Sequence, residues 1–225
     1  EVQKGELVSL LGLSGIGKTT LFHVLSGLER PDSGQVLLNG EDITGAAGRV
    51  SYMQQKDLLL PFQTVIDNVS IPLRLGGMKK RQAREKAKPY LEEFGLSGCE
   101  GKYPNELSGG MRQRAALLRA YLYSGDMMLL DEPFSALDAI TKSGLHQWFQ
   151  SVVRRHGTTA VFITHDIDEA ILLSDRVYIM SGAPGRITGE IPIVCDGVRD
   201  RDFTMTESFI RYKKDILSRI GADVR

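Results

Sequence analysis

The chain has 225 residues, of which 42% are hydrophobic and 25% charged, a composition typical of a globular protein. Lys plus Arg and Asp plus Glu both number 28, so the formal net charge is zero, which argues against a protein that coats nucleic-acid duplexes. The two cysteines, Cys99 and Cys195, lie far apart without CxxC spacing, which argues against a disulfide framework or a zinc site. No stretch reaches the roughly 20 apolar residues that span a bilayer, so any membrane role needs a partner.

Short apolar runs alternate with helix-prone stretches along most of the chain. Most runs are continuous rather than alternating, which suits strands buried on both faces of a sheet. Helical stretches lie between several of them and predict an α/β fold with a largely parallel sheet. Glycines between 34 and 48 separate short strands and turns, and this pattern predicts a small β-rich layer. The expected strands are Leu7–Leu11, Gln35–Leu38, Arg49–Met53, Met127–Asp131, Thr159–Thr164 and Arg176–Met180.

The segment 76–125 differs from the rest because it holds no convincing strand. Its first part, Met78–Phe94, is basic and helix-prone, and we interpret it as a solvated helix face, the alternative being a surface that meets an acidic partner. Pro89 should kink this helix or start a new one. Gly95 should end it as a C-cap. We therefore expect a helical subdomain inserted at 76–125.

The end of the chain predicts one further helix. Thr204 and Glu207 fit a T-x-x-E capping box, and the apolar residues that follow fall largely on one helical face. We expect a helical tail at 196–225, and a core that the inserted subdomain divides into 1–75 and 126–195.

A glycine-rich segment follows the first expected strand and fits G-x-x-x-x-G-K-[ST] at every fixed position. Glycines let the backbone curl so that its N–H groups face phosphate oxygens, and the next helix adds its positive end. Lys18 then reaches the β- and γ-phosphates, and the Thr19 hydroxyl ligates Mg²⁺. A plain glycine turn is the alternative, whereas a dinucleotide fingerprint fails because Thr20 replaces its third glycine. The expected nucleotide-binding residues are Gly12, Ser14, Gly15, Ile16, Gly17, Lys18, Thr19 and Thr20.

Two acids end the strand expected at Met127–Asp131. Asp131 would lie at the carboxyl edge of the sheet, where a metal bound to phosphate would sit. Glu132 comes one residue later and can reach a water aimed at the γ-phosphate. An Asp-Glu pair alone is a weak signal. Together with the glycine-rich segment 12–20, here called the phosphate cradle, it predicts one acid for the metal and one for the water.

Several classes of P-loop protein share a phosphate-binding loop and an acidic strand. The segment Leu107–Arg114, LSGGMRQR, indicates which of these classes this chain is similar to. It is a serine-led, glycine-rich helix start and thus a second anion-binding element. It resembles the signature motif of ABC ATPases, in which Ser108, Gly109 and Gly110 would contact the ATP of a facing subunit in a head-to-tail dimer. Met111 replaces the glutamine usual in that motif. The resemblance implies a P-loop NTPase (RecA-like) core with an antiparallel β-rich layer and an inserted helical subdomain.

Other residues resemble ABC motifs in the right order. Gln55 resembles the Q-loop glutamine, which touches Mg²⁺ and senses the membrane partner, and the position of Pro61 favours it over Gln54. Asp138 resembles the D-loop aspartate that crosses the dimer interface. His165 resembles the switch histidine that contacts the γ-phosphate. The resemblance thus implies Glu132, His165 and Gln55 as catalytic residues and Thr19, Gln55 and Asp131 as the Mg²⁺ set.

The resemblance implies an ATPase that binds ATP and Mg²⁺ and drives transport by ATP-dependent closure of a homodimer, or of a dimer with a related cassette. Apolar residues in Leu58–Phe62 and Thr64–Val69 are similar to those that form the coupling-helix groove of importers. The stretches DEPFSALD and SGAPGRI resemble the nitrate, sulfonate and taurine importer group, which includes relatives assigned to thiamine-precursor pyrimidines. The expected location is the cytoplasmic face of the cell membrane, with permease subunits as partners, an extracytoplasmic solute-binding protein as an indirect partner, and no nucleic acid.

Two other kinds of ABC protein are the alternatives. A DNA-repair or chromosome ATPase would need a long heptad insertion, and none is present between Gln55 and Ser108. A translation-associated ABC protein carries two cassettes, and this chain has one.

The start of the chain departs from the family pattern. Family members carry an aromatic residue that stacks on adenine in a segment before the first core strand. Here Lys4–Glu6 already leads into that strand. We therefore expect the N-terminal strand with this aromatic to be missing from this chain.

Overall fold

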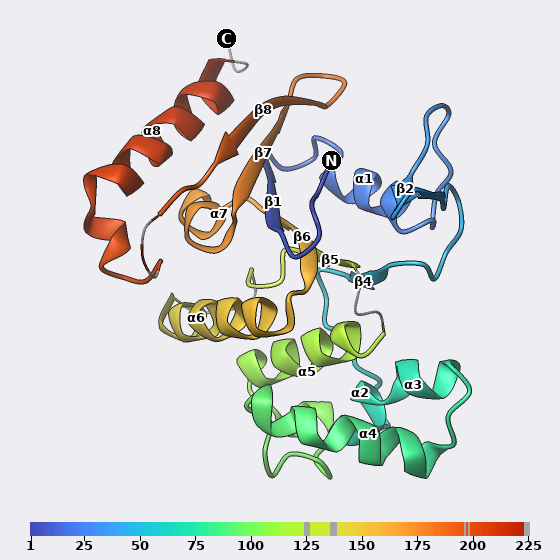
Figure 1. Cartoon of the computed structure of the whole chain (residues 1–225). Helices are drawn as coiled ribbons and strands as arrows, with labels where there is room; N and C mark the ends of the chain where they lie inside the picture. The colour runs from blue at the N-terminus through green and yellow to red at the C-terminus, as the bar shows by residue number, and fades with distance from the viewer. Residues whose placement is uncertain (124–126, 136–138, 196, 198, 223–225) are drawn as a thin grey trace.

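The computed structural model describes residues 1–225 apart from 124–126, 136–138, 196, 198 and 223–225. At its centre a six-stranded sheet has the order β4-β5-β6-β1-β7-β8 (Figure 1). Its strands are β1 (Leu7–Gly12), β4 (Ser51–Met53), β5 (Met127–Asp131), β6 (Thr159–Thr164), β7 (Arg176–Ser181) and β8 (Arg186–Pro192). The pairs from β4 to β7 are parallel, and β8 pairs antiparallel with β7. The expected α/β fold with a largely parallel sheet is confirmed.

The central strands are largely apolar because both faces of the sheet are covered. Every residue of β1 and of β6 is buried. Phe162 on β6 belongs to the main hydrophobic cluster, whereas its neighbour Val161 belongs to a second cluster on the opposite face. Successive side chains of a strand point to opposite faces, so a continuous apolar run is what such a strand requires.

The edges of the sheet were harder to predict. Strand β8 was not predicted from the sequence, because most of its residues are exposed and no apolar run marks it. The expected strand Gln35–Leu38 is reduced to β2 (Leu37–Leu38), which pairs antiparallel with β3 (Glu41–Asp42). This pair is the expected small β-rich layer, and it lies at the right of Figure 1.

The described residues between β4 and β5 form four helices, which lie together at the bottom of Figure 1. They are α2 (Val65–Val69), α3 (Ile71–Leu75), α4 (Lys80–Glu93) and α5 (Gly109–Tyr121), with a 3-10 turn at Pro104–Glu106. The other helices are α1 (Lys18–Leu25), α6 (Ala139–His156), α7 (Ile167–Leu173) and α8 (Glu207–Ala222), with a 3-10 turn at Phe203–Met205. No helix in the described part of the chain is both long and apolar enough to cross a bilayer.

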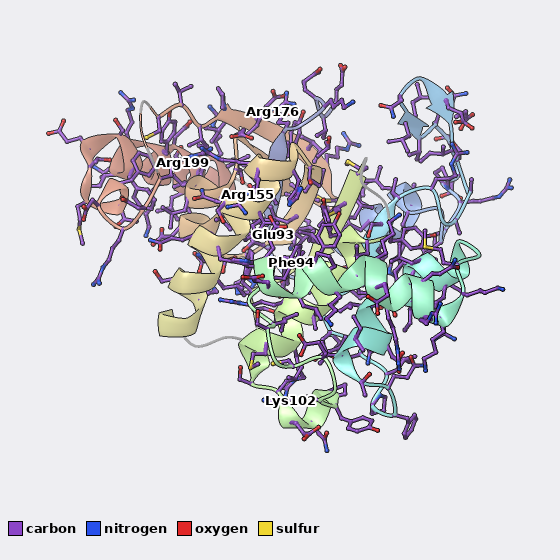
Figure 2. All side chains as sticks on the ribbon, turned by 60° about the horizontal axis from the view of Figure 1, so that its bottom comes forward. Glu93, Phe94, Lys102, Arg155, Arg176 and Arg199 are labelled. Atoms are coloured by element: carbon purple, nitrogen blue, oxygen red, sulfur yellow. The ribbon has the colours of Figure 1, made fainter. Side chains whose placement is uncertain are left out.

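The main hydrophobic cluster joins the helical segment to the sheet, since it runs from Leu130 on β5 to Leu91 on α4. Polar contacts reinforce this junction at the ends of α4 and α6. Glu93 Oε1 lies 3.1 Å from Arg155 Nη1 and 2.8 Å from His156 Nε2, and Trp148 Nε1 donates to the Glu93 carbonyl at 2.9 Å. Figure 2 shows Glu93 and Arg155 close together at this junction.

The structure decides between two alternatives at Pro89. A new helix does not start there: α4 is one helix with Pro89 inside it, and Ala83, Ala87 and Leu91 bury its inner face. The expected cap at Thr204 is wrong, since its hydroxyl donates to the Arg201 carbonyl. Thr206 caps α8 instead, accepting from the Phe209 amide at 3.2 Å.

The expected helix end at Gly95 is confirmed, with Gly95 in the left-handed region at φ 65°. The basic run on α4 is not simply a solvated face. Arg84 donates to both carboxylate oxygens of Asp67, at 2.8 and 2.7 Å, and Lys80 Nζ lies 3.2 Å from Oδ2. Asp67 on α2 is buried, and these cations join α2 to α4.

We expect Asp67→Asn to lower the free energy of unfolding by about 1 to 3 kcal/mol at neutral pH, because it removes two charge-assisted hydrogen bonds. Hydrogen bonds from Arg84 hold the pKa of Asp67 at about 2, despite its burial. An unfolded aspartate has a pKa of about 3.9, so this stabilisation is complete above about pH 4 and is lost as the pH falls to about 2.

Denaturant unfolding of both proteins at a series of pH values checks this. The control is Asp215→Asn, which removes an exposed i,i+4 pair with Arg219 and should cost about 0.5 kcal/mol or less. Equal losses in the two variants would contradict the role assigned to Asp67.

Candidate functional site

The phosphate cradle of the sequence motif forms a tight loop between the end of β1 and the start of α1. Gly15 and Gly17 take φ values of 79° and 102°, in the left-handed region that favours glycine. A Cβ on Gly12 would lie 2.5 Å from the Met180 carbonyl oxygen, so no other residue fits there. The three glycines are therefore required by the loop itself.

Lys18 is buried inside this loop and is held by backbone oxygens. Its Nζ donates to the carbonyls of Gly12 at 2.7 Å and Leu13 at 2.8 Å. Burial lowers the pKa of Lys18, and the nearby Glu132 and Asp131 carboxylates oppose this effect. An ammonium group has three donors, so one is left for an anionic ligand.

A hydroxyl and a carboxylate meet beside the cradle. Thr19 Oγ1 donates to Asp131 Oδ2 at 2.9 Å, and the Tyr52 hydroxyl lies 3.4 Å from the same oxygen. Burial raises the pKa of Asp131, as does the neighbouring Glu132, while the bonds from Thr19 and Tyr52 and the charge of Lys18 oppose the rise. Tyr52 was not expected at the site from the sequence, although it lies in the strand that pairs with the strand of Asp131.

The Thr19 and Asp131 oxygens are the hard ligands that Mg²⁺ prefers, and this ion commonly takes its other ligands from phosphates and water. Among the described residues there is no group of three or more His, Cys, Asp and Glu side chains that could hold a metal by themselves. The pair therefore fits Mg²⁺ only as part of a complex with a phosphate ligand.

The three residues expected to be catalytic converge on one carboxylate. Gln55 Nε2 donates to Glu132 Oε2 at 3.0 Å, and His165 Nδ1 lies 3.2 Å from Glu132 Oε1. These residues follow β4, β5 and β6, three neighbouring strands that end at the same edge of the sheet. The His165 side chain is 60% exposed, so it can reach a ligand in the space above the edge.

The backbone at Glu132 is unusual, because its φ of 46° lies in the left-handed region. Residues other than glycine rarely adopt this conformation, and where they do it often marks a functional site. The Glu132 amide donates to the Ile163 carbonyl at 3.1 Å, which ties the turn to β6.

The residues of the signature motif lie apart from this cluster. Ser108 is the N-cap of α5 and accepts from the Met111 amide at 3.3 Å, and Gly109 and Gly110 open the helix. In Figure 1, α5 lies in the lower helical part, whereas α1 lies beside the upper part of the sheet. Met111, which replaces the usual glutamine, packs partly buried against the main hydrophobic cluster. Asp138, the expected D-loop residue, lies outside the described residues.

Comparison with known proteins agrees with this geometry. A family model described as "ABC transporter" matches residues 1–135. The formylaminopyrimidine import ATP-binding protein of Halalkalibacterium halodurans is 43% identical over 96% of this chain and 85% of its own length. The aliphatic sulfonates import ATP-binding protein of Bacillus cereus is 39% identical over 96% of this chain and 84% of its own.

A solved structure shows the same arrangement of elements. It is the dimeric ATP-binding cassette MJ0796 in a post-hydrolysis state with ADP and Pi. It superposes with a TM-score of 0.74 and 28% identity, covering 87% of this chain and 88% of that chain.

We expect Lys18→Ala to weaken the binding of Mg·ATP by at least about tenfold, because the variant loses the buried cation that would face the phosphates. Titration calorimetry with ATP and Mg²⁺ measures this, with the exposed Lys86→Ala on α4 as the control. Equal affinities of Lys18→Ala and Lys86→Ala for Mg·ATP would show that the cradle is not part of the nucleotide-binding site.

Proposed function

Because this chain belongs to the ATP-binding subunits of ABC transporters and is an ATPase coupled to transport, we propose that it powers the import of a small polar solute. The relatives named above import a formylaminopyrimidine and aliphatic sulfonates. A solute of the nitrate, sulfonate and taurine kind, or a pyrimidine precursor, would fit both the relatives and the stretches DEPFSALD and SGAPGRI. The observation that carries the proposed chemistry is the convergence of Gln55 and His165 on Glu132, beside the Thr19–Asp131 pair.

In the proposed site, Glu132 polarises the water that attacks the γ-phosphate. Each carboxylate oxygen has about two acceptor positions. Gln55 occupies one on Oε2 and His165 one on Oε1, so room remains for the water. The same two side chains would orient the carboxylate, and His165 would contact the γ-phosphate. Such positioning supplies most of the catalysis in phosphoryl transfer.

The phosphates would be held by the cradle. Lys18 directs its remaining donor at the β- and γ-phosphate oxygens, together with the backbone amides from Gly12 to Thr20. A bound Mg²⁺ would neutralise charge on those oxygens, and we propose Thr19, Asp131 and Gln55 as the residues that hold it. The carbonyls of Gly12 and Leu13 accept from two of the three Lys18 donors, so this buried charge is paired with hydrogen-bond acceptors.

A second subunit would complete the site. The start of α5 presents Ser108, Gly109 and Gly110 as an anion-binding helix end. We propose that they contact the ATP held by the cradle of the facing subunit, and that Asp138 lies at the same interface. The dimeric state of the solved cassette supports this arrangement. Either a homodimer or a dimer with a related cassette would provide this contact between subunits.

A groove of about 470 Å³ separates the β4 edge of the core from the helical segment. Leu58, Leu60 and Leu75 line it, and the Leu75 side chain is 77% exposed. Arg119 on α5 fixes one wall, donating to the carbonyls of Asp57 and Leu58 at 2.6 and 2.7 Å. An open apolar groove of this kind suits an inserted helix.

We propose that a permease helix docks in this groove and that 76–125 works as a helical subdomain between a core of 1–75 and 126–195, with 196–225 as a tail. The protein would thus act at the cytoplasmic face of the membrane. It would reach a solute-binding protein only through the permease.

We expect Glu132→Gln to keep ATP affinity within about twofold, to lower turnover at least about 100-fold, and to accumulate as a dimer with Mg·ATP. The amide keeps the shape of the side chain but is a poor acceptor for the water proton. Steady-state phosphate release and size-exclusion chromatography measure the two effects, with the exposed Glu85→Gln as the control. Wild-type turnover in Glu132→Gln would remove Glu132 from the catalytic role.

We expect Leu75→Asp to reduce copurification with the co-expressed permease at least about fivefold while leaving the ATPase activity of the isolated chain unchanged, because a charge in an apolar groove is costly. Met205→Asp is the matched control, since Met205 is equally exposed at 77% and lies outside the groove. Copurification with ribosomes or DNA in place of the permease would overturn the transport proposal in favour of a translation-associated or DNA-repair ABC protein.

A further inference from the structure

Glu169 on α7 is a buried carboxylate that the proposed chemistry does not use, with only 4% of its surface exposed. Thr164 Oγ1 donates to its Oε2 at 2.6 Å. On the other side, Oε1 forms an ion pair with Lys142 and lies 3.4 Å from His146 Nε2. Three side chains from two other elements, β6 and α6, therefore point at this one group.

The same groups fix both neighbours of His165. Thr164 precedes it, and the Thr164 hydroxyl that binds Glu169 also accepts from the Asp166 amide at 3.0 Å. Asp166 follows it, and its Oδ2 lies 3.2 Å from Lys142 Nζ. Asp166 Oδ1 caps α7 through the amides of Asp168 and Glu169. The backbone on each side of His165 is thus tied to the Glu169–Lys142 pair.

The pair also links two elements that carry site residues. Lys142 lies near the start of α6, the helix that begins at Ala139, directly after the expected D-loop residue in the sequence. His146, one helical turn later, packs edge-on against the Phe134 ring at 4.7 Å, in the turn that follows Glu132. Figure 1 shows α6 and α7 as neighbours on the left side of the sheet. The network therefore reaches the turns of both His165 and Glu132.

A buried carboxylate is costly unless it is paired and hydrogen-bonded. Burial by itself would raise the pKa of Glu169, but the bonds from His146, Lys142 and Thr164 outweigh it and lower the pKa. The carboxylate thus stays charged. Removing one partner leaves the others unsatisfied, which makes the arrangement stiff rather than adaptable. A stiff support matters here because an error of about 1 Å in the placement of a catalytic group can cost about 100-fold in rate.

We propose that Glu169, together with Lys142, is a positioning residue for ATP hydrolysis: it holds the Thr164–Asp166 turn so that His165 faces Glu132, and it couples this turn to α6. The inference rests on the proposed role of His165. Glu169 is buried against Thr164, Lys142 and His146, so we expect its effect on turnover to pass mainly through the His165 turn.

The test compares Glu169→Ala with His165→Ala and with the double variant, using the purified full chain. Glu169→Ala should lower kcat about tenfold while the KM for ATP changes less than about twofold, because binding by the cradle is untouched. The double variant should turn over no more slowly than His165→Ala alone. A residue that merely supports the fold would instead add its loss to that of His165.

Two further variants keep the test valid if Glu169→Ala folds poorly. Thr164→Val removes only the hydroxyl at nearly constant volume. It should lower kcat as Glu169→Ala does, and it should cause no further loss of kcat when combined with His165→Ala. Thr164→Ser keeps the hydroxyl and should restore turnover to within about twofold of wild type. Glu190→Ala is the control, because it breaks another ion pair, with Arg176, on the edge strand β8.

The outcomes separate the two proposals. If His165→Ala is impaired while Glu169→Ala and Thr164→Val turn over at the wild-type rate, the positioning role is overturned and the proposed function stands. A further loss in the double variant beyond that of His165→Ala would also overturn it. Wild-type turnover in His165→Ala would overturn the role of His165 itself, and the positioning role with it.

Discussion

The site depends on the parallel pairing of four neighbouring strands. Because β1 pairs with β6, β6 with β5 and β5 with β4, all in parallel, their carboxyl ends meet at one edge of the sheet. The phosphate loop, Gln55, Glu132 and His165 all come directly after these ends. Residues separated by up to 112 positions in the chain thus lie within hydrogen-bonding distance, and Thr19 and Asp131 are such a pair. An antiparallel strand inserted among them would place its following loop at the opposite edge.

Three buried charges in this protein are each paired with groups of the protein itself. Lys18 is held by two backbone carbonyls, Asp131 by two hydroxyls, and Glu169 by a lysine and a threonine. In the proposed complex, Lys18 directs its remaining donor at the phosphates and Asp131 binds the metal, so neither is buried as a bare charge. Glu169 has no such ligand in the proposed site, which is consistent with a supporting role.

Helix α5 connects three parts of the proposed transporter subunit. Its first residues are the signature glycines, Arg119 near its other end binds the carbonyls of the groove wall, and its apolar face lies in the main hydrophobic cluster with the sheet. A helix about 20 Å long is effectively rigid. In the proposed transporter, a permease helix in the groove and the nucleotide of the facing subunit would therefore act on opposite ends of one rigid element.

The sequence by itself determined the features that depend on neighbouring residues. Glycine spacing predicted the phosphate loop, continuous apolar runs predicted the central strands, and Gly95 predicted the end of α4, because backbone conformation and burial on both faces are encoded locally. Only the tertiary structure decided which distant groups meet. The bonds of Tyr52 to Asp131, of Arg84 to Asp67 and of Thr206 rather than Thr204 to α8 could not be predicted from spacing. The same holds for the edge strand β8 and for the environment of Glu169, since the partner of a polar group is chosen by distance in the folded chain, and a sequence pattern carries no such distance.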